Sequence, residues 1–269
     1  MKLYKLKLKQ GVWQHTSTTK SLVASDTIFH ALMHNAGVTN CVEKLKSIAD
    51  DTYISSLFPM VNDKPIVPIG GAWHELDTEN MKPGKKVSVS IRSFVKSQVS
   101  ISRLEEAGVP HYGGIRVPFY GSSTKAVPVF DCYLLVSSPD PNLLDFLINV
   151  TSDEGFGGRR VHGYGAYQVI DVVEVPEPKI KNKSLLLSTI VPKKLHGAAL
   201  IDREGYTDEF WRRYNGSSSP PTRVKRNIYS AIEGTILKEK EVFCGENIIY
   251  DDMIHYGKGI AIERGDPNG

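Results

Sequence analysis

The chain has 269 residues, which is long for one small domain and sufficient for two. Hydrophobic residues make up 41% of it, so a buried core can form, while the formal net charge is only +3. Proteins that coat nucleic acid without regard to its sequence are usually more basic, so any surface for RNA or DNA must be local. The cysteines lie far apart and lack metal-ligand spacing, so we expect reduced, buried thiols in a cytoplasmic protein. They are Cys41, Cys132 and Cys244.

The N-terminal segment MKLYKLKLKQ alternates lysine with apolar residues, which predicts a strand and not a signal peptide. No apolar run has the length of a membrane span. TIFHALMHNA then predicts a helix with Ser25 or Asp26 as its N-cap. Thr39 is expected to cap a second short helix that ends at Ile48.

The middle of the chain has less regular patterns. YISSLFP predicts a strand that ends at Pro59, and residues 61–127 form a long region punctuated by proline and glycine. We expect this region to be irregular and to be ordered by partners or RNA. Residues 129–138 predict a buried strand, and a helix is expected to begin near Pro141. A glycine-rich stretch then leads into the strand YQVIDVVEV, which ends before Pro176.

This order of elements predicts an α+β fold. Strand, helix, long excursion, strand, helix, glycine loop and strand suit a ferredoxin-like (RRM-like) βαββαβ unit with one elaborated β-hairpin. We predict an N-terminal domain over residues 1–176, with a hairpin insertion at about 92–128. After the linker VEVPEPKIKNKS, residues 177–269 are expected to form a smaller domain, for which a degenerate ferredoxin-like half is one interpretation.

The most informative stretch is SDEGFGGRRVHGYGAY, residues 152–167, which holds five glycines and the pair Arg159 and Arg160. Glycine permits positive φ and lets a ligand approach the backbone, and successive amides in such a loop can form a concavity for phosphate. Two guanidiniums add charge-assisted donors. This composition is typical of a loop that holds a bent single strand of nucleic acid. The rings that could stack on a base are those of Phe156, Tyr164, Tyr167 and His162.

Other interpretations of the glycines fit less well. A dinucleotide-binding GxGxxG loop follows a strand and opens a helix, whereas this loop follows a predicted helix and opens a strand. A Walker phosphate loop needs a Gly-Lys-Ser/Thr ending, which the stretch lacks. A tight structural turn stays open as an alternative, although five glycines and two arginines exceed what a turn requires.

Several segments resemble one protein family. GFGGRRVHGYGAY resembles the glycine-rich loop of the RAMP superfamily, the repeat-associated mysterious proteins of CRISPR systems. SDTIFHALMHNA, ISSLFP and SQVSISRLEEAGVPHYGG resemble the first-helix motif, the Phe-Pro strand and the arginine-containing stretch before the inserted hairpin. YSAIEGTIL and MIHYGKGIAI resemble the closing motifs of one subtype. Together these segments are similar to the fourth-subunit (Cas-five-like) family of type III-A CRISPR effector (Csm) complexes, over nearly the whole chain.

The resemblance implies a non-catalytic RNA-binding subunit, without cofactor or metal, that acts in antiviral defence. Such a subunit holds the repeat-derived 5′ handle of the crRNA and contacts the large polymerase/cyclase subunit and the backbone subunit. Its thumb-like hairpin, implied between Gly108 and Val127, disturbs the duplex of guide and target RNA. Ser25 and Asp26 are implied near the handle, and the thumb's base would carry Arg103 and Arg116. The residues implied to cradle the handle are Gly155, Phe156, Gly157, Gly158, Arg159, Arg160, Val161, His162, Gly163, Tyr164 and Gly165.

An enzymatic alternative comes from related RAMP endoribonucleases, which process precursor crRNA without metal and use a histidine base. His30, His34 and His111 are the candidates, although we expect the first two to be packed or solvent-facing. HALMH lacks the glutamate of a HExxH zinc site. The remaining clusters have open interpretations. Asp50–Asp51 and Asp251–Asp252 could bind a divalent ion, although such pairs are more often solvated turn residues. Arg223, Lys225 and Arg226 fit a phosphate or partner contact or a solvated face, and Trp211 fits an interface anchor or a core residue.

Overall fold

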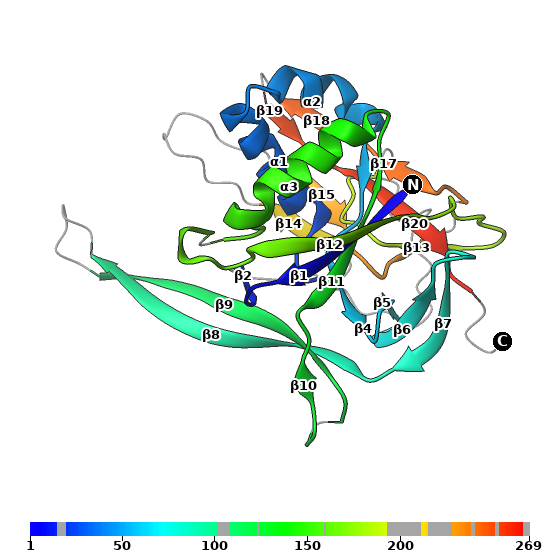
Figure 1. Ribbon diagram of the computed structural model, residues 1–269, viewed down its shortest axis with the longest axis horizontal. Helices are drawn as coiled ribbons and strands as arrows, with labels where there is room; N and C mark the ends of the chain where they lie inside the picture. The colour runs from blue at the N-terminus through cyan, green and yellow to red at the C-terminus, as the bar shows by residue number, and fades with distance from the viewer. Residues whose placement is uncertain are drawn as a thin grey trace.

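The computed structural model describes residues 1–14, 20–101, 108–122, 124–158, 160–192, 211–214, 228–237, 240–250 and 253–265. The fold is α+β, as the sequence predicted. The helices α1, α2 and α3 lie on one side of the central sheet, and the hairpin of β8 and β9 projects from the body (Figure 1). No helix in these ranges is long and apolar enough to cross a membrane.

The central sheet has the strand order β12-β1-β11-β4-β5-β6-β7, and β3 pairs separately with β11. Neighbouring strands are antiparallel. Its first four strands and two helices follow one another as strand, helix, strand, strand, helix, strand, which is the predicted connectivity. These elements are β1 (Lys2–Leu8), α1 (Ser25–Val38), β4 (Phe58–Val61), β11 (Asp131–Ser137), α3 (Pro141–Glu154) and β12 (Tyr167–Glu174).

The described part of the region 61–127 consists mainly of β-strands, so the prediction of an irregular region was wrong there. Its proline and glycine residues lie in antiparallel strands and in the turns between them. Asn62 and Asp63 both have positive φ and connect β4 to β5, as residues of a tight hairpin turn do. The strands of this region are β5 (Lys64–Ile69), β6 (Ala72–Asp77), β7 (Lys82–Val87), β8 (Val89–Ile101), β9 (Gly108–Tyr120) and β10 (Val127–Pro128).

The helix ends differ in part from the predicted ones. α1 begins at Ser25 with Ala24 as N-cap, and no side chain caps it, so neither Ser25 nor Asp26 has that role. Thr39 closes α1 instead of opening the next helix, and its hydroxyl donates to the Asn35 carbonyl at 2.8 Å. At α3 the prediction was right: proline opens the helix, and the Asp140 side chain accepts from the Leu143 amide at 3.0 Å.

The remaining elements are short. Near the N-terminus and the first helix lie β2 (Val12–Gln14), α2 (Val42–Ile48), the 3-10 turn η1 (Ala49–Asp51) and β3 (Tyr53–Ile54). A second 3-10 turn, η2 (Arg160–His162), lies in the glycine-rich stretch. The C-terminal part holds β13 (Ser184–Leu186), β14 (Trp211–Tyr214), β15 (Ile228–Ala231), β16 (Ile236–Leu237), β17 (Phe243–Gly245), β18 (Ile248–Tyr250), β19 (Met253–His255) and β20 (Lys258–Glu263).

Two hydrophobic clusters cover the two faces of the central sheet. On the helix side, Tyr4 and Leu6 of β1 pack with Phe29 of α1 and Leu144 of α3. On the other side, Leu3, Phe58 and Tyr133 join Leu185 and Ile260, which belong to the sheet β16-β13-β20-β17. The parts of the chain before and after residue 176 therefore share a core. Cys132 and Cys244 are buried, Cys41 is half-buried, and all three are free thiols.

Candidate nucleic-acid interface

The glycine-rich loop begins where α3 ends and folds back on itself at once. Gly155 has φ +78 and Gly165 has φ +75, a region in which side chains are strained. A Cβ on Gly155 would lie 2.2 Å from the Gly165 carbonyl carbon, and one on Gly165 would lie 1.9 Å from the Phe156 carbonyl oxygen. Both positions require glycine because the two limbs of the loop touch through their backbones.

Three of the glycine amides in the loop donate hydrogen bonds to backbone carbonyls within the protein. Gly155 donates to the Thr151 carbonyl at 2.7 Å, Gly158 to Trp13 at 2.9 Å and Gly165 to Gly11 at 3.2 Å. The expectation that successive glycine amides face a phosphate is therefore wrong for these groups. They bind the loop to α3 and to the segment around β2, and they make it a rigid support.

Two of the aromatic rings expected to stack on bases lie in the core. Phe156 is 0% exposed, and its ring stacks on that of Tyr167 with centroids 4.7 Å apart. The Tyr167 hydroxyl donates to the Ile148 carbonyl at 2.5 Å. These two rings have no free face for a base. Tyr164 is half-buried, and its ring lies 5.7 Å from that of Trp13.

The part of the loop that faces outward is the 3-10 turn from Arg160 to His162. Val161 is 93% exposed, and the His162 side chain is exposed beside it. The backbone carbonyl of His162 accepts from the Gln10 side chain at 3.0 Å. Arg160 is half-buried, and its Nη1 lies 3.0 Å from Glu154 Oε2. Arg159 lies outside the described residues.

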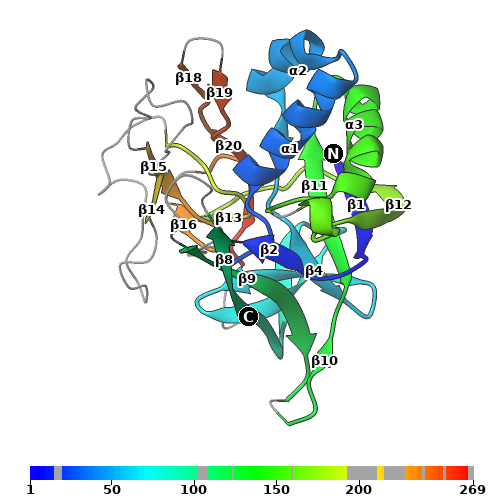
Figure 2. The same cartoon turned by 90° about the vertical axis from the view of Figure 1, so that its left-hand side faces the viewer.

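The short strand β2 joins this loop to the projecting hairpin. Trp13 forms a β-bridge with Gly158 of the loop, and it also pairs with Ile115 of β9. Figure 2 shows β2 beside β8 and β9, where Val12 pairs with Arg116. The glycine-rich loop and the hairpin, which the sequence indicated separately, are therefore parts of one surface region.

The hairpin carries aromatic and cationic side chains near its base. β8 and β9 have 13 residues each and pair along their whole lengths. The Arg92 guanidinium lies over the Phe119 ring, 4.4 Å from its centroid, and the Phe94 ring lies 6.2 Å from it. Phe94 is 51% exposed. The sequence reasoning missed this group because it treated the region as irregular, although alternation in VSIRSFV could have revealed a strand.

Arg116 faces the protein interior and not the surface. It is 8% exposed, and its Nη1 donates to the Ser21 carbonyl at 2.6 Å. Burial lowers the pKa of Arg116 to about 10, and the nearby charge of Glu233 opposes that shift. The residue lies at the base of the hairpin, as expected, but its guanidinium is not placed to meet a ligand. Arg103 lies outside the described residues.

Ser25 and Asp26 are also buried, which argues against a direct contact with RNA. The Ser25 hydroxyl donates to the Thr189 carbonyl and accepts from the Thr189 amide, each at 3.0 Å. Asp26 is 2% exposed. Their position at the start of α1 thus ties the first helix to the segment after β13.

A buried glutamate accounts for part of the motif YSAIEGTIL. Glu233 is 1% exposed, and its Oε1 accepts from Ser21 and Thr189, each at 3.0 Å, and from Ser56. Four segments far apart in the sequence meet at this carboxylate. The motif residue therefore stabilises the packing beneath the hairpin.

Two of the three histidine candidates, His30 and His34, lie on α1, and each contacts a different partner. His30 Nε2 lies 3.2 Å from the Ile254 carbonyl, and His34 Nε2 lies 3.8 Å from Glu154 Oε2. His111 lies in β9 opposite Gln98. Within the described ranges, no three His, Cys, Asp or Glu side chains come together as a metal site requires.

The other predicted clusters have mixed outcomes. Asp50 accepts from the Asn247 side chain at 3.0 Å, so it joins a turn to the C-terminal part. Asp251 and Asp252, and the group Arg223, Lys225 and Arg226, lie outside the described residues. For Trp211 the structure describes the strand β14, which pairs with β15.

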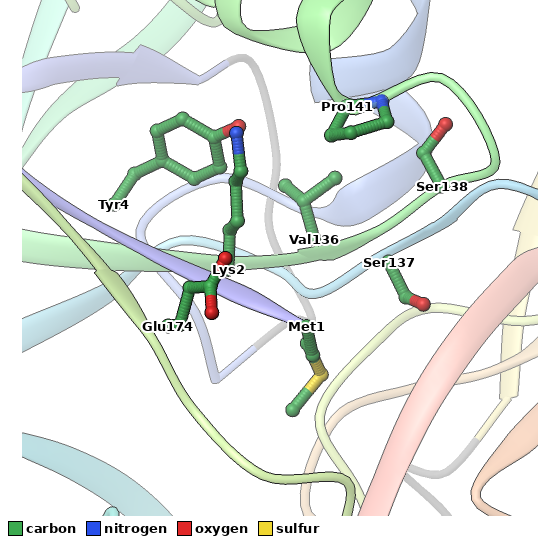
Figure 3. A pocket seen from close by; sticks show the side chains of 8 residues that line it. All are labelled: Met1, Lys2, Tyr4, Val136, Ser137, Ser138, Pro141 and Glu174. Atoms are coloured by element: carbon green, nitrogen blue, oxygen red, sulfur yellow. The ribbon is translucent and has the colours of Figure 1, made fainter.

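A pocket lies beside the first residue of α3, Pro141, which is one of its lining residues (Figure 3). The glycine-rich loop follows the other end of this helix. Since α3 has 14 residues, the two places are about 20 Å apart. The Lys2 amine lies 2.6 Å from Asp145 Oδ2, and the Tyr4 hydroxyl donates to the same carboxylate. The polar groups of β1 at this pocket are thus paired within the protein. The lining residues are Met1, Lys2, Tyr4, Val136, Ser137, Ser138, Pro141 and Glu174.

Comparison with known proteins gives structural matches only. No family model and no curated protein matches the sequence. A chain of the Csm3–Csm4 subcomplex of the type III-A CRISPR–Cas interference complex matches at 17% identity with a TM-score of 0.64, over 99% of this chain and 100% of that one. A chain of the Csm1–Csm4 cassette in complex with cA4 matches at 16% identity with a TM-score of 0.57, over 100% of both chains.

The same cassette in complex with one ATP matches at 16% identity with a TM-score of 0.54. Csm4 is the subunit named in all three structures. The likeness in fold therefore spans 99–100% of this chain in the first two matches. The expected resemblance to subunits of type III-A CRISPR complexes is thereby confirmed at the level of fold: this chain has the fold of a chain found in the Csm3–Csm4 and Csm1–Csm4 structures.

Proposed function

We propose that this protein is a non-catalytic RNA-binding subunit of a type III-A CRISPR (Csm) interference complex and that it holds the 5′ handle of the crRNA. The observation that carries the proposal is the likeness in fold to Csm4-containing structures over the full length of both chains. The motifs that suggested this family lie at the loop, the hairpin and the supports beneath them. A ribonucleoprotein of this kind acts in the cytoplasm, in antiviral defence.

The geometry supports two separate roles within the glycine-rich loop, one for its glycines and one for its side chains. Its glycines cross closely and donate inward, so they hold the turn Arg160–His162 in a fixed position. That turn presents the imidazole of His162 and the guanidinium of Arg160. Arginine binds phosphate oxygens through paired donors, and a half-buried Tyr164 ring offers one stacking partner for a base. Arg159 adds a second guanidinium from the sequence.

The hairpin supports the second part of the proposal, contact with the duplex of guide and target RNA. Phe94 is exposed, and Arg92 covers the neighbouring Phe119 ring. Aromatic rings and arginine side chains stack on bases regardless of their identity. The proposed partners are therefore crRNA, target RNA, the large polymerase/cyclase subunit and the backbone subunit.

The first experiment measures RNA binding and cleavage on one gel. The full chain is incubated in EDTA with labelled repeat–spacer RNA and with RNA that lacks the repeat-derived handle. We expect a shifted, uncut RNA that depends on the handle, with affinity falling by a slope of about −0.7 per neutralised phosphate as salt increases. A discrete cut within the repeat would instead favour the metal-independent endoribonuclease.

A charge variant tests the loop itself. Arg159→Ala/Arg160→Ala is expected to weaken handle binding strongly and to reduce handle retention after co-expression with the large and backbone subunits. The matched control is Lys44→Ala/Lys46→Ala, which also removes two positive charges but lies on α2. Equal handle retention in the loop variant and in wild type would contradict the proposal.

A further inference from the structure

The last turn of α3 carries two adjacent carboxylates, Asp153 and Glu154, directly before the glycine-rich loop. The carbonyl groups at a helix C-terminus carry partial negative charge, so acidic side chains are unfavourable there. Helix stability therefore does not explain this pair, whereas the cations that surround the two carboxylates do.

Each carboxylate neutralises a cation beside the loop. Lys9 Nζ lies 2.9 Å from Asp153 Oδ1, and Arg160 Nη1 lies 3.0 Å from Glu154 Oε2. His34 Nε2 lies 3.8 Å from the same Glu154 oxygen. The two cations and the imidazole come from the segment after β1, from the loop and from α1, so the two acids contact three separate segments of the surface.

A hydrogen bond from the Asn35 side chain fixes the Glu154 carboxylate in its position beside Arg160. The buried Asn35 side chain donates to Glu154 Oε2 at 3.4 Å and to the Thr151 hydroxyl at 3.2 Å. The Thr151 hydroxyl in turn donates to the Leu147 carbonyl at 2.7 Å. The carboxylate is thus fixed against the surface from which Arg160 projects.

Paired cations attract a phosphate chain less than unpaired ones do. Binding without sequence preference gains its free energy from counterions that lysine and arginine displace from phosphates, and a carboxylate beside each cation reduces that gain. A guanidinium has five donors, so Arg160 can keep one bond to Glu154 while others reach a well-fitted phosphate. An RNA whose phosphate fits the turn therefore loses little binding free energy through the pairing of Arg160 with Glu154. An RNA that is held only by general charge attraction loses most of that attraction.

We propose that Asp153 and Glu154 are specificity-determining residues that suppress binding of RNA without the correct shape by neutralising Lys9 and Arg160. This inference rests on the proposed function, because it concerns how the same surface selects its RNA. It assigns the two acids to the rejection of unrelated RNA and leaves the handle's own contacts to the loop.

The test compares Asp153→Asn/Glu154→Gln with wild type in the full chain. Both side chains are substantially exposed, so the variant is expected to fold, which a thermal melt checks. The matched control is Glu43→Gln, which removes an exposed acid from the i,i+3 pair with Lys46 on α2. Two labelled RNAs of equal length are titrated at low and high salt, one with the repeat-derived handle and one scrambled.

We expect the variant to bind scrambled RNA about three to ten times more tightly at low salt, because two surface pairs are removed. Its salt slope should become steeper by about 0.7 for each cation released, and the handle RNA should gain less. The preference for the handle therefore falls, while the control matches wild type.

The outcomes separate this inference from the proposed function. If wild type prefers the handle and the variant keeps the same ratio of affinities, only the inference fails. If wild type has no preference but the variant binds both RNAs more tightly with a steeper slope, the handle-holding function fails and the neutralising role stands. If neither protein binds either RNA, both fail.

Discussion

The ring of Tyr256 stacks on the ring of Phe29, with centroids 4.2 Å apart and planes 11° from parallel. The Tyr256 hydroxyl donates to the Thr52 carbonyl at 3.0 Å and accepts from the Ile54 amide at 2.9 Å. One side chain near the C-terminus thus fixes both the first helix and the strand that follows it. The closing motif MIHYGKGIAI therefore has a structural reason for its tyrosine.

Replacing Tyr256 by Phe keeps the ring stack and removes the hydroxyl. The Ile54 amide then lies buried without this partner, which costs about 1–3 kcal/mol. Urea denaturation measures the loss. Tyr120→Phe on β9 is the control and should stay within about 0.5 kcal/mol of wild type. Equal stability of the two variants would show that the hydroxyl contributes nothing.

Gly165→Ala tests the close crossing of the glycine-rich loop. The new Cβ would meet the Phe156 carbonyl oxygen at 1.9 Å while the backbone keeps φ +75. Gly71→Ala is a matched control, since Gly71 has φ +78 with open space around its Cβ position, and it should cost about 1–2 kcal/mol. We expect Gly165→Ala to cost clearly more, because steric overlap adds to the backbone strain. A loss no larger than that of the control would mean that the loop adapts.

Glu233→Ala tests the buried tie beneath the hairpin. Removing the carboxylate leaves the Ser21, Ser56 and Thr189 hydroxyls without their acceptor and Arg116 without its neighbouring charge. The expected loss of unfolding free energy is about 3–5 kcal/mol. Hydrogen exchange should also accelerate in β8 and β9, since Arg116 anchors the hairpin. An unchanged melting temperature would contradict this assignment.

Stability should fall most steeply above pH 10. Burial raises the pKa of Tyr133, Tyr167 and Tyr256 well above the ordinary value of about 10. In the unfolded chain these phenols ionise near pH 10, while the folded protein keeps their protons. Their contribution to the free energy of unfolding is therefore fully present below pH 10. Above pH 10 it falls by about 1.4 kcal/mol per group and pH unit. Arg116 has a lowered pKa and acts in the opposite direction, but it is one group against these three tyrosines. Burial also raises the pKa of Tyr4, Tyr53 and the Cys132 thiol, which act in the same direction as the three tyrosines.

Thermal melts between pH 8 and 11 check this balance. The melting temperature should begin to fall above about pH 9, where the Cys132 thiol ionises only in the unfolded chain, and should fall more steeply above about pH 10. The steeper fall should be smaller in Tyr256→Phe, which loses one ionisable group. A melting temperature that rises above pH 10 would mean that the Arg116 contribution dominates.

The sequence predicted the α+β fold and the order of its principal strands and helices, because hydrophobic periodicity reports which faces are buried. It also located the glycine-rich loop. It could not tell that Gly155 and Gly165 touch each other, because that contact depends on tertiary packing. The same limit hid the burial of Phe156: an aromatic residue between glycines looks exposed in sequence, whereas here it fills the core under the loop. Arg116 is the opposite case, because a cationic residue in a strand looks exposed in sequence but is buried here. Alternation along the strand does not tell which of its two faces lies toward the Glu233 carboxylate.

The strand β2 gives the surface a mechanical property. Its two edges bridge the loop at Gly158 and pair with the hairpin at Ile115, so neither neighbour can shift without pulling the other. Just before it, a Cβ on Gly11 would lie 2.5 Å from the Ile115 side chain and 2.8 Å from the Arg116 carbonyl oxygen. A methyl group at residue 11 would therefore push β9 away from the segment before β2. Such a substitution would displace the hairpin without changing any residue of the glycine-rich loop.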